Sequence, residues 1–273
     1  DSQITGIYQG LKQWGYVPGV NLAVKMLNAK GDAEMALKNA QDFADDGLSL
    51  VIAMGQPMAG ILQKTLAGNT PMLFLNVYDP VSSGLSQQSR LGIGPVSGAS
   101  SLVKEDALVH AAVSLKPDAQ WLALLHGPNI DGQAFVQAVE ARNLGAQTMM
   151  LSDPALLLEE GKKLLQSSDL LILALDSDAK ESIKQLREAA LSENKVLLGI
   201  LPSQVMEGAA AALAADPVSM GLSCGTMAAG ILNGQDVAAI PYEDSSLVLC
   251  YFNFGAEEAL GLQLPRNAEP VFE

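Results

Sequence analysis

Short apolar runs alternate with amphipathic stretches along most of the chain. The runs have the length of strands, and their near-continuous apolar sequence is typical of parallel strands covered on both faces. They occupy residues 48–54, 71–77, 121–126, 146–151, 169–175 and 195–200. The stretches between them, such as residues 130–143, have the length and period of amphipathic helices. The repeated order of strand, helix and strand predicts an α/β fold with right-handed crossovers.

Four aspartates mark the starts of predicted helices. Asp32, Asp131, Asp153 and Asp216 each precede a helix-compatible run, and Pro follows directly after the last two. A carboxylate at this position accepts hydrogen bonds from the free amides of the first turn, and Pro suits the first helical position because it lacks an amide hydrogen. Helix capping therefore explains these aspartates without a functional role.

The chain opens on a predicted helix, with Ile4, Ile7 and Leu11 on one face and Gly15 at its end. Residues 20–26 then alternate as a half-buried strand. In a doubly wound sheet the first helix normally follows a central strand, and without that strand its neighbours would bury unpaired backbone groups. The first strand is thus apparently missing, and we expect either an upstream strand or another segment in its place.

A Gly- and Ser-rich segment at residues 90–101 separates two blocks of this alternating pattern, and we interpret it as a crossing between domains. The chain has 273 residues, which is long for one compact domain and sufficient for two. Its hydrophobic content of 49% can fill two cores. We therefore predict two α/β domains.

The charge of the chain argues against polyanionic partners. Lys and Arg number 16 against 30 Asp and Glu, for a formal net charge of −14, so most of the surface would repel nucleic acid or an anionic membrane. No apolar run reaches the roughly 18 to 20 residues that span a bilayer, so we expect no direct membrane insertion of this segment. The two thiols are Cys224 and Cys250, and spacing alone leaves open whether they pair.

Polar residues, Gly or Pro directly follow four of the predicted strands. The carboxyl ends of parallel strands, with the helix N-termini beside them, are the usual ligand sites of open α/β sheets. The four ends are Met54-Gly55-Gln56-Pro57, Val77-Tyr78-Asp79-Pro80, Leu125-His126-Gly127-Pro128-Asn129 and Leu175-Asp176-Ser177-Asp178.

Each of these ends has a functional and a purely local interpretation. Gly55 permits close backbone approach to a ligand and Gln56 offers a donor and an acceptor, but spacing alone favours the simpler interpretation of a tight strand-to-helix turn. Asp79 could neutralise a ligand ammonium group or cap its own turn. Asp176 and Asp178 could bind a ligand or interact with a helix dipole.

Nucleotide-binding motifs are absent from the sequence. It contains no phosphate-binding G-x-x-x-x-G-K-[ST], and its glycines form no dinucleotide-binding pattern. His126 could act as a general base with an aspartate in an α/β hydrolase, and this alternative stays open. We predict no catalytic residue, no cofactor and no metal site.

Several segments together show a familiar order. They are "GLKQWGYVPGVNLAV" (10–24), "LVIAMGQPMA" (50–59), "TPMLFLNVYDPVSSGL" (70–85), "GIGPVSG" (92–98), "MEGAAAALAADPVSMG" (206–221), "AAGILNGQDVAAIPYE" (228–243) and "LCYFNFGAEEALGLQLP" (249–265). In order and spacing they resemble the ABC-transporter substrate-binding proteins of the type I periplasmic-binding fold, which include binders of tryptophan and other aromatic amino acids. The resemblance covers nearly the whole chain.

This resemblance implies two doubly wound, Rossmann-like lobes with parallel central sheets, joined by three crossing segments near residues 95, 215 and 247. Each lobe is then discontinuous. The N-terminal lobe would comprise residues 1–96 and 216–246, and the C-terminal lobe residues 97–215 and 247–273.

Site residues follow from the resemblance by position. The N-terminal side would supply Gly55, Gln56 and Pro57 at a Gly-Thr-Pro turn, Asp79 at an Asp-Pro-Val sequence, and Ser97 in a Gly-x-Ser turn. The opposite lobe would supply His126, Asn129, Asp176, Ser177 and the Gly208-Ala209 turn. The chain departs from the family pattern where Gln56 replaces a hydroxyl residue and Ser177 replaces Asn, so the resemblance does not name the ligand.

The function implied is that of a non-enzymatic, extracytoplasmic solute-binding protein. It would close two lobes over a small polar ligand, with an amino acid as one candidate, and deliver this ligand to an ABC permease in the membrane. The expected location is periplasmic or otherwise extracytoplasmic, with lipid anchoring before processing left open. The alternative within the same fold is the ligand-sensing domain of a signalling receptor.

Overall fold

Two parallel sheets organise the chain, one in each of two structural units. The computed structural model describes residues 2–127, 130–175, 180–245, 247–266 and 268–271. Unit one comprises Asp1–Leu102 and Ala215–Leu247, and unit two comprises Val103–Ala214 and Val248–Glu273. The chain therefore crosses between units three times. The first crossing follows residue 102 and not residue 96, because Val96–Ser100 forms a strand of unit one.

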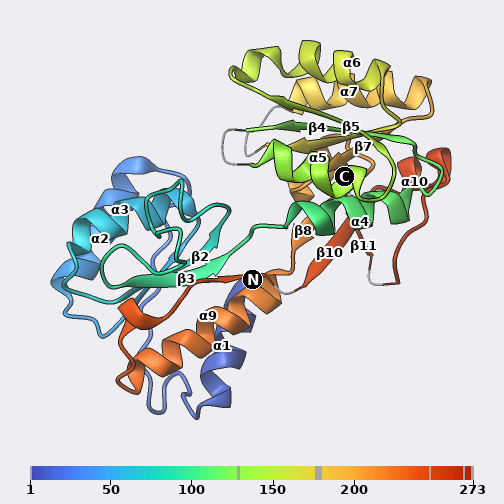
Figure 1. The fold of residues 1–273 in the computed structure, drawn as a ribbon. Coiled ribbons are helices and arrows are strands. Elements are labelled where there is room, and N and C mark those ends of the chain that lie inside the picture. The colour runs from blue at the N-terminus through green and yellow to red at the C-terminus, as the bar shows by residue number, and fades with distance from the viewer. Residues whose placement is uncertain (1, 128–129, 176–179, 246, 267, 272–273) are drawn as a thin grey trace. The chain divides into compact units, whose positions relative to one another are not determined.

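Unit one has a four-stranded, fully parallel sheet in the order β1-β2-β3-β9. Helices α1 and α9 cover one face of this sheet, and helices α2 and α3 cover the other (Figure 1). The elements are α1 (Ser2–Gln13), α2 (Ala33–Asp45), β1 (Val51–Met54), α3 (Gln56–Leu66), β2 (Met72–Val77), β3 (Val96–Ser100), α9 (Pro217–Leu232), the 3-10 helix η2 (Val237–Ala239) and β9 (Glu243–Asp244).

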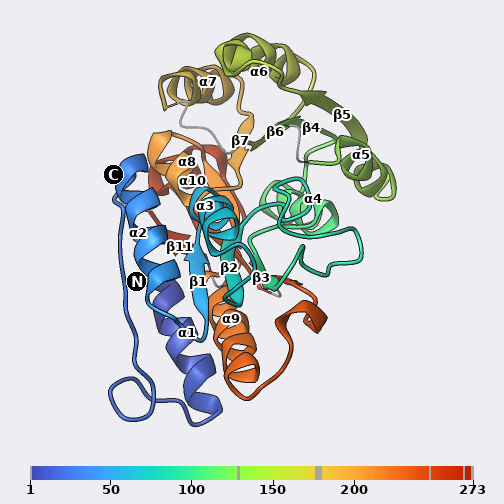
Figure 2. The same cartoon turned by 90° about the vertical axis from the view of Figure 1, so that its left-hand side faces the viewer.

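Helices α1 and α9 lie side by side and approach each other very closely (Figure 2). Glycines make this approach possible on both helices. A Cβ on Gly6 of α1 would lie 2.3 Å from Val218 O, and a Cβ on Gly225 of α9 would lie 2.2 Å from Ile7 O. A side chain at either position would therefore push the helices apart.

Unit two has a seven-stranded sheet in the order β11-β10-β8-β7-β6-β4-β5. Helices α6 and α7 pack on one face over a core of leucines from β4, β6 and β7. The elements are α4 (Glu105–Leu115), β4 (Trp121–His126), α5 (Gly132–Glu140), β5 (Gly145–Met150), the 3-10 helix η1 (Pro154–Leu156), α6 (Leu157–Gln166), β6 (Leu170–Ala174), α7 (Lys180–Ser192), β7 (Val196–Gly199), α8 (Pro202–Glu207), β8 (Ala211–Ala215), β10 (Val248–Phe252), α10 (Phe254–Leu260) and β11 (Glu269–Pro270).

The apolar runs and the caps predicted from the sequence are confirmed. All six runs contain a strand, from β1 and β2 in unit one to β4, β5, β6 and β7 in unit two. The Asp32 side chain accepts a hydrogen bond from Met35 N at 2.7 Å, and Asp216 accepts one from Val218 N at 2.7 Å. Asp131 and Asp153 cap α5 and η1 in the same way.

Two element predictions are wrong. Residues 20–26 form no strand, and within the described part of the chain they belong to neither sheet. Residues 90–101 are not only a crossing, because they contain β3. β3 is buried on both faces with small side chains, and a Cβ on its Gly98 would lie 2.1 Å from Phe74 O. β3 therefore consists mostly of small residues that pack closely against their neighbours, and it lacks the large apolar residues from which the other strands were predicted.

Candidate functional site

The turn from β1 into α3 places polar groups at the carboxyl edge of the unit-one sheet. Gly55 has φ +87° and precedes the first helical residue, Gln56. That backbone conformation is readily accessible only to glycine. Its N–H donates to Leu75 O at 2.8 Å, which fixes the turn to β2. Gln56 and Pro57 are exposed, so the Gln56 amide is open to a ligand.

The end of β2 contains a residue that the sequence analysis did not single out. Asn76 has φ +60° and interrupts the register between β2 and β3, where the pairing shifts between Leu75 and Val77. Bulges of this kind re-aim a side chain and are frequent beside functional sites. Asn76 is exposed within an otherwise buried strand. The only sequence signal was an Asn, a residue that tolerates positive φ, inside an apolar run.

Asp79 follows β2 and caps its own turn. Its Oδ1 accepts hydrogen bonds from Val81 N at 2.9 Å and Ser82 N at 3.2 Å. The capping interpretation is thus confirmed. These two hydrogen bonds hold the half-buried carboxylate of Asp79 in one orientation, two residues after the carboxyl end of β2.

Ser97 lies inside β3 and not in a turn, contrary to the sequence-based expectation. It is fully buried, and its Oγ faces the sulfur of Met227 on α9 at 4.0 Å. The described structure therefore places Ser97 in the core between the sheet and α9. Ser97 is therefore buried, whereas Gln56 and Asn76 are exposed to solvent.

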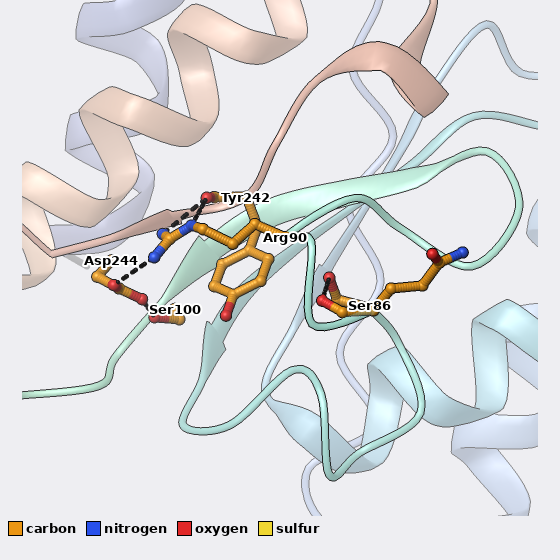
Figure 3. A network of polar contacts seen from close by, with 6 residues as sticks. Ser86, Arg90, Ser100, Tyr242 and Asp244 are labelled. Carbon is orange, nitrogen blue, oxygen red and sulfur yellow. Dashed lines mark hydrogen bonds and ion pairs between the residues drawn. The ribbon is translucent and has the colours of Figure 1, made fainter. Parts of the chain in front are cut away.

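A charged network joins the loop before β3 to the last strand of the sheet (Figure 3). The Arg90 guanidinium donates to Asp244 Oδ2 at 2.8 Å and to Tyr242 O at 2.8 and 3.1 Å, and it lies 4.3 Å from the Tyr242 ring centroid. Ser100 Oγ donates to Asp244 Oδ1 at 2.8 Å. Both carboxylate oxygens of Asp244 are therefore engaged, and the network fixes the segment that leads into the third crossing.

In unit two, His126 ends β4 and is 6% exposed. Its Nδ1 lies 2.7 Å from Gly127 O, a hydrogen bond that requires the proton on Nδ1. The other nitrogen faces α5, since a Cβ on Gly132 would lie 2.6 Å from Nε2. His126 is thus packed and hydrogen-bonded, and no aspartate among its described contacts orients it as a general base.

The remaining unit-two candidates are not gathered around His126. Gly208, with φ +127°, ends α8, and Ala209 is fully buried ahead of β8. The parallel register aligns Ala211 with Leu198, which puts Ala209 level with the start of β7, whereas His126 is at the end of β4. Ala209 thus lies at the amino ends of the parallel strands, and His126 lies at their carboxyl ends. Asn129, Asp176 and Ser177 lie outside the described residues.

The described residues contain no group of three or more His, Cys, Asp or Glu side chains that could hold a metal ion.

Cys224 and Cys250 are free thiols in different units. Burial raises the pKa of Cys224 to about 12 and that of Cys250 to about 11. Both thiols are therefore protonated near neutral pH and are poor nucleophiles.

No helix within the described ranges combines the length and the apolar character needed to cross a bilayer.

The fold is that of the type I periplasmic-binding proteins, as solved structures show. The open, ligand-free structure of CD0873 from Clostridium difficile, a substrate-binding protein with adhesive properties, has a TM-score of 0.80 and 23% identity, covering 99% of this chain and 94% of that one.

Two further structures share the fold. An ABC domain from Streptococcus pneumoniae in complex with L-Trp has a TM-score of 0.72 and 20% identity, covering 100% of this chain and 95% of that one. The complex of the TorS sensor domain with TorT, without ligand, has a TM-score of 0.52 and 16% identity, covering 100% and 94%. A search of curated proteins found no match.

A sequence profile described as ABC transporter substrate binding protein matches residues 1–269. The chain belongs to this family. Its members are extracytoplasmic substrate-binding proteins and not enzymes, and they act with a small-molecule ligand and an ABC permease. The hydrolase alternative based on His126 is therefore wrong, in agreement with the packed environment of this residue.

Proposed function

We propose that the chain binds a small polar solute, with an amino acid as the leading candidate, and delivers it to an ABC permease at the outer face of the membrane. The observation that carries this proposal is the polar carboxyl edge of the unit-one sheet. Gln56, Asn76 and Asp79 follow or interrupt the adjacent strands β1 and β2, whose other residues are largely buried.

The chemistry of these three groups suits a zwitterion. The Asp79 carboxylate can accept hydrogen bonds from a ligand ammonium group, and such charge-assisted bonds are about twice as strong as neutral ones. The amides of Gln56 and Asn76 can donate to a ligand carboxylate, as can free N–H groups in the first turn of α3. A micromolar dissociation constant needs only about −8 kcal/mol, which a few such bonds can supply once the costs of association are met.

The two lobes are proposed to close over the ligand and exclude water. Unit two would contribute His126 and the candidates Asn129, Asp176 and Ser177. An amino-acid ligand is supported by the ABC domain from Streptococcus pneumoniae, which shares this fold and was solved in complex with L-Trp. Because that protein is only 20% identical, the side chain of the ligand is left open.

The ligand class can be found with a thermal-shift screen of amino acids, nucleosides and small carboxylic acids. A solute at 100 times its dissociation constant adds about 2.7 kcal/mol to the free energy of unfolding. The sensing alternative is tested by gene neighbourhood. Adjacent permease and ATPase genes support transport, whereas a kinase or cyclase in the same reading frame supports sensing.

Asp79→Asn tests the site itself. The variant keeps Oδ1, and hence the cap to Val81 and Ser82, but removes the charge that we propose for the ligand ammonium. We expect its dissociation constant for the solute to rise by roughly ten-fold or more in calorimetric titration. Asp236→Asn is the matched control, since Asp236 caps η2 through Ala238 N at 3.0 Å, and its affinity should be unchanged. Equal affinity of the Asp79→Asn variant and the native chain would remove Asp79 from the site.

A further inference from the structure

Tyr242 directly precedes β9 and carries a hydroxyl that forms no hydrogen bond within the described part of the chain. Its side chain is 8% exposed and belongs to the core cluster that also contains Val77 and Leu85. Its hydrogen bonds use the backbone, since Tyr242 N donates to Arg90 O at 2.9 Å and Tyr242 O accepts from the Arg90 guanidinium. The hydroxyl is not one of the fully buried atoms that lack a partner, so it retains contact with solvent. Because buried tyrosines usually pair their hydroxyl, this one is available to a ligand.

The ring of Tyr242 is held in place from two sides. The Arg90 guanidinium lies 4.3 Å from the ring centroid, and the Phe74 ring centroid lies 5.9 Å away with an interplanar angle of 53°. The strand between these two rings, β3, has Gly98 at the level of Phe74, where a Cβ would lie 2.6 Å from Phe74 Cγ. Figure 3 shows the ring extending beside the Arg90 side chain, with the hydroxyl at its free end. The position of the hydroxyl is therefore well defined.

The hydroxyl of Tyr242 lies near the carboxylate of Asp79. Val77 and Leu85 share a core cluster with the Tyr242 ring, and these two residues flank the turn that contains Asp79. Burial raises the pKa of Tyr242, and the negative charge of Asp79 raises it as well, against the opposing charge of Arg90. The hydroxyl is therefore protonated at neutral pH and is a neutral donor beside an anionic acceptor.

Asp79 has one carboxylate oxygen to spare. Its Oδ1 accepts hydrogen bonds from two backbone amides of its own turn, whereas its Oδ2 accepts none from the residues that the structure describes. The cation beside Tyr242 is not available in the same way, because Arg90 donates to Asp244 and to Tyr242 O. This part of unit one thus offers a ligand one anionic acceptor, Asp79 Oδ2, and one neutral donor, the Tyr242 hydroxyl.

We propose that the Tyr242 hydroxyl donates a hydrogen bond to the α-carboxylate of an amino-acid ligand whose α-ammonium group binds Asp79 Oδ2. An α-amino acid carries both groups on one carbon atom, so an acceptor and a donor that lie side by side match them together. A neutral donor suits this place, because a free cation here would compete with the ligand ammonium for Asp79. The inference rests on the proposed function and narrows its solute class to α-amino acids.

Tyr242→Phe tests the donor, since it leaves the ring in contact with Arg90 and Phe74. The probes are the twenty protein amino acids, titrated one at a time by calorimetry. For the tightest binder, the amine without the carboxylate is then measured by saturation-transfer NMR, which detects millimolar binding. We expect the dissociation constant of the amino acid to rise about ten-fold or more in the variant, as for loss of a hydrogen bond to a charged group. The dissociation constant of the amine should be the same in both proteins.

Tyr16→Phe is the matched control. It also removes one tyrosine hydroxyl, which donates to Asn233 Oδ1 at 3.0 Å. Tyr16 packs with the core on the other face of the unit-one sheet, so we expect the affinity for the amino acid to stay unchanged.

The outcomes separate this inference from the proposed function. Unchanged affinity of Tyr242→Phe, together with weaker binding by Asp79→Asn, would overturn the inference and leave the Asp79 site in place. An equal loss for the amino acid and the amine would also overturn it, since the hydroxyl would then act on the structure and not on the carboxylate. Failure of every amino acid to bind the native chain, or unchanged affinity in both variants, would overturn the proposed site and the inference together.

Discussion

At the residue scale, burial controls the chemistry of the two thiols. Cys224 is fully buried on α9 and its pKa is raised from 9.0 to about 12, because the thiolate would lose its hydration there. In the unfolded chain the same thiol ionises near pH 9. The protonated thiol therefore contributes stability that is fully present below pH 9 and is lost as the pH rises from 9 toward 12.

Cys224→Ala should make stability less sensitive to alkaline pH. Between pH 8 and pH 10 we expect the native chain to lose about 1 kcal/mol more of its free energy of unfolding than the variant does. Urea unfolding of both proteins at the two pH values measures this difference. The cavity left by the missing sulfur lowers stability equally at both pH values and so cancels. If the free energy of unfolding fell by the same amount in both proteins between pH 8 and pH 10, the raised pKa of Cys224 would be contradicted.

At the element scale, the contact between α1 and α9 depends on glycine. Gly225→Ala improves helix propensity by about 1 kcal/mol, but its Cβ would meet the Ile7 carbonyl oxygen, which belongs to the backbone and cannot rotate away. We expect a net loss of about 1–3 kcal/mol in the free energy of unfolding, measured with urea. Gly60→Ala in α3 is the control, since no atom lies within 4 Å of its Cβ and it should be neutral or stabilising. A stabilised Gly225→Ala variant would show that the helices separate easily.

The same scale shows what the sequence could and could not predict. Strands such as β2 and β6 were predictable, because burial on both faces demands continuous large apolar residues. β3 and β8 were not, because close packing selects Ser, Gly and Ala there. Asp79 was predictable from its place after a strand, whereas Asn76 depends on a bulge. The pairing of Arg90 with Asp244 joins residues too far apart in sequence for any local pattern to reveal.

At the scale of the whole molecule, the chain is two units with separate cores that are tied by three crossings. Neither unit is continuous in sequence, so each needs both of its segments to complete its fold. Within unit one the polar groups lie at the carboxyl ends of strands, the edge at which open parallel sheets bind ligands. This arrangement, together with the family, supports a protein whose chemistry is reversible binding.

Native mass spectrometry tests this central claim most directly. The chain is incubated with a pool of amino acids, nucleosides and small carboxylic acids, desalted, and measured before and after the bound solute is released by unfolding. We predict one solute molecule per chain, recovered with its mass unchanged and with much lower occupancy in the Asp79→Asn variant. Recovery of a chemically altered solute, or equal occupancy in the native chain and the variant, would contradict the account.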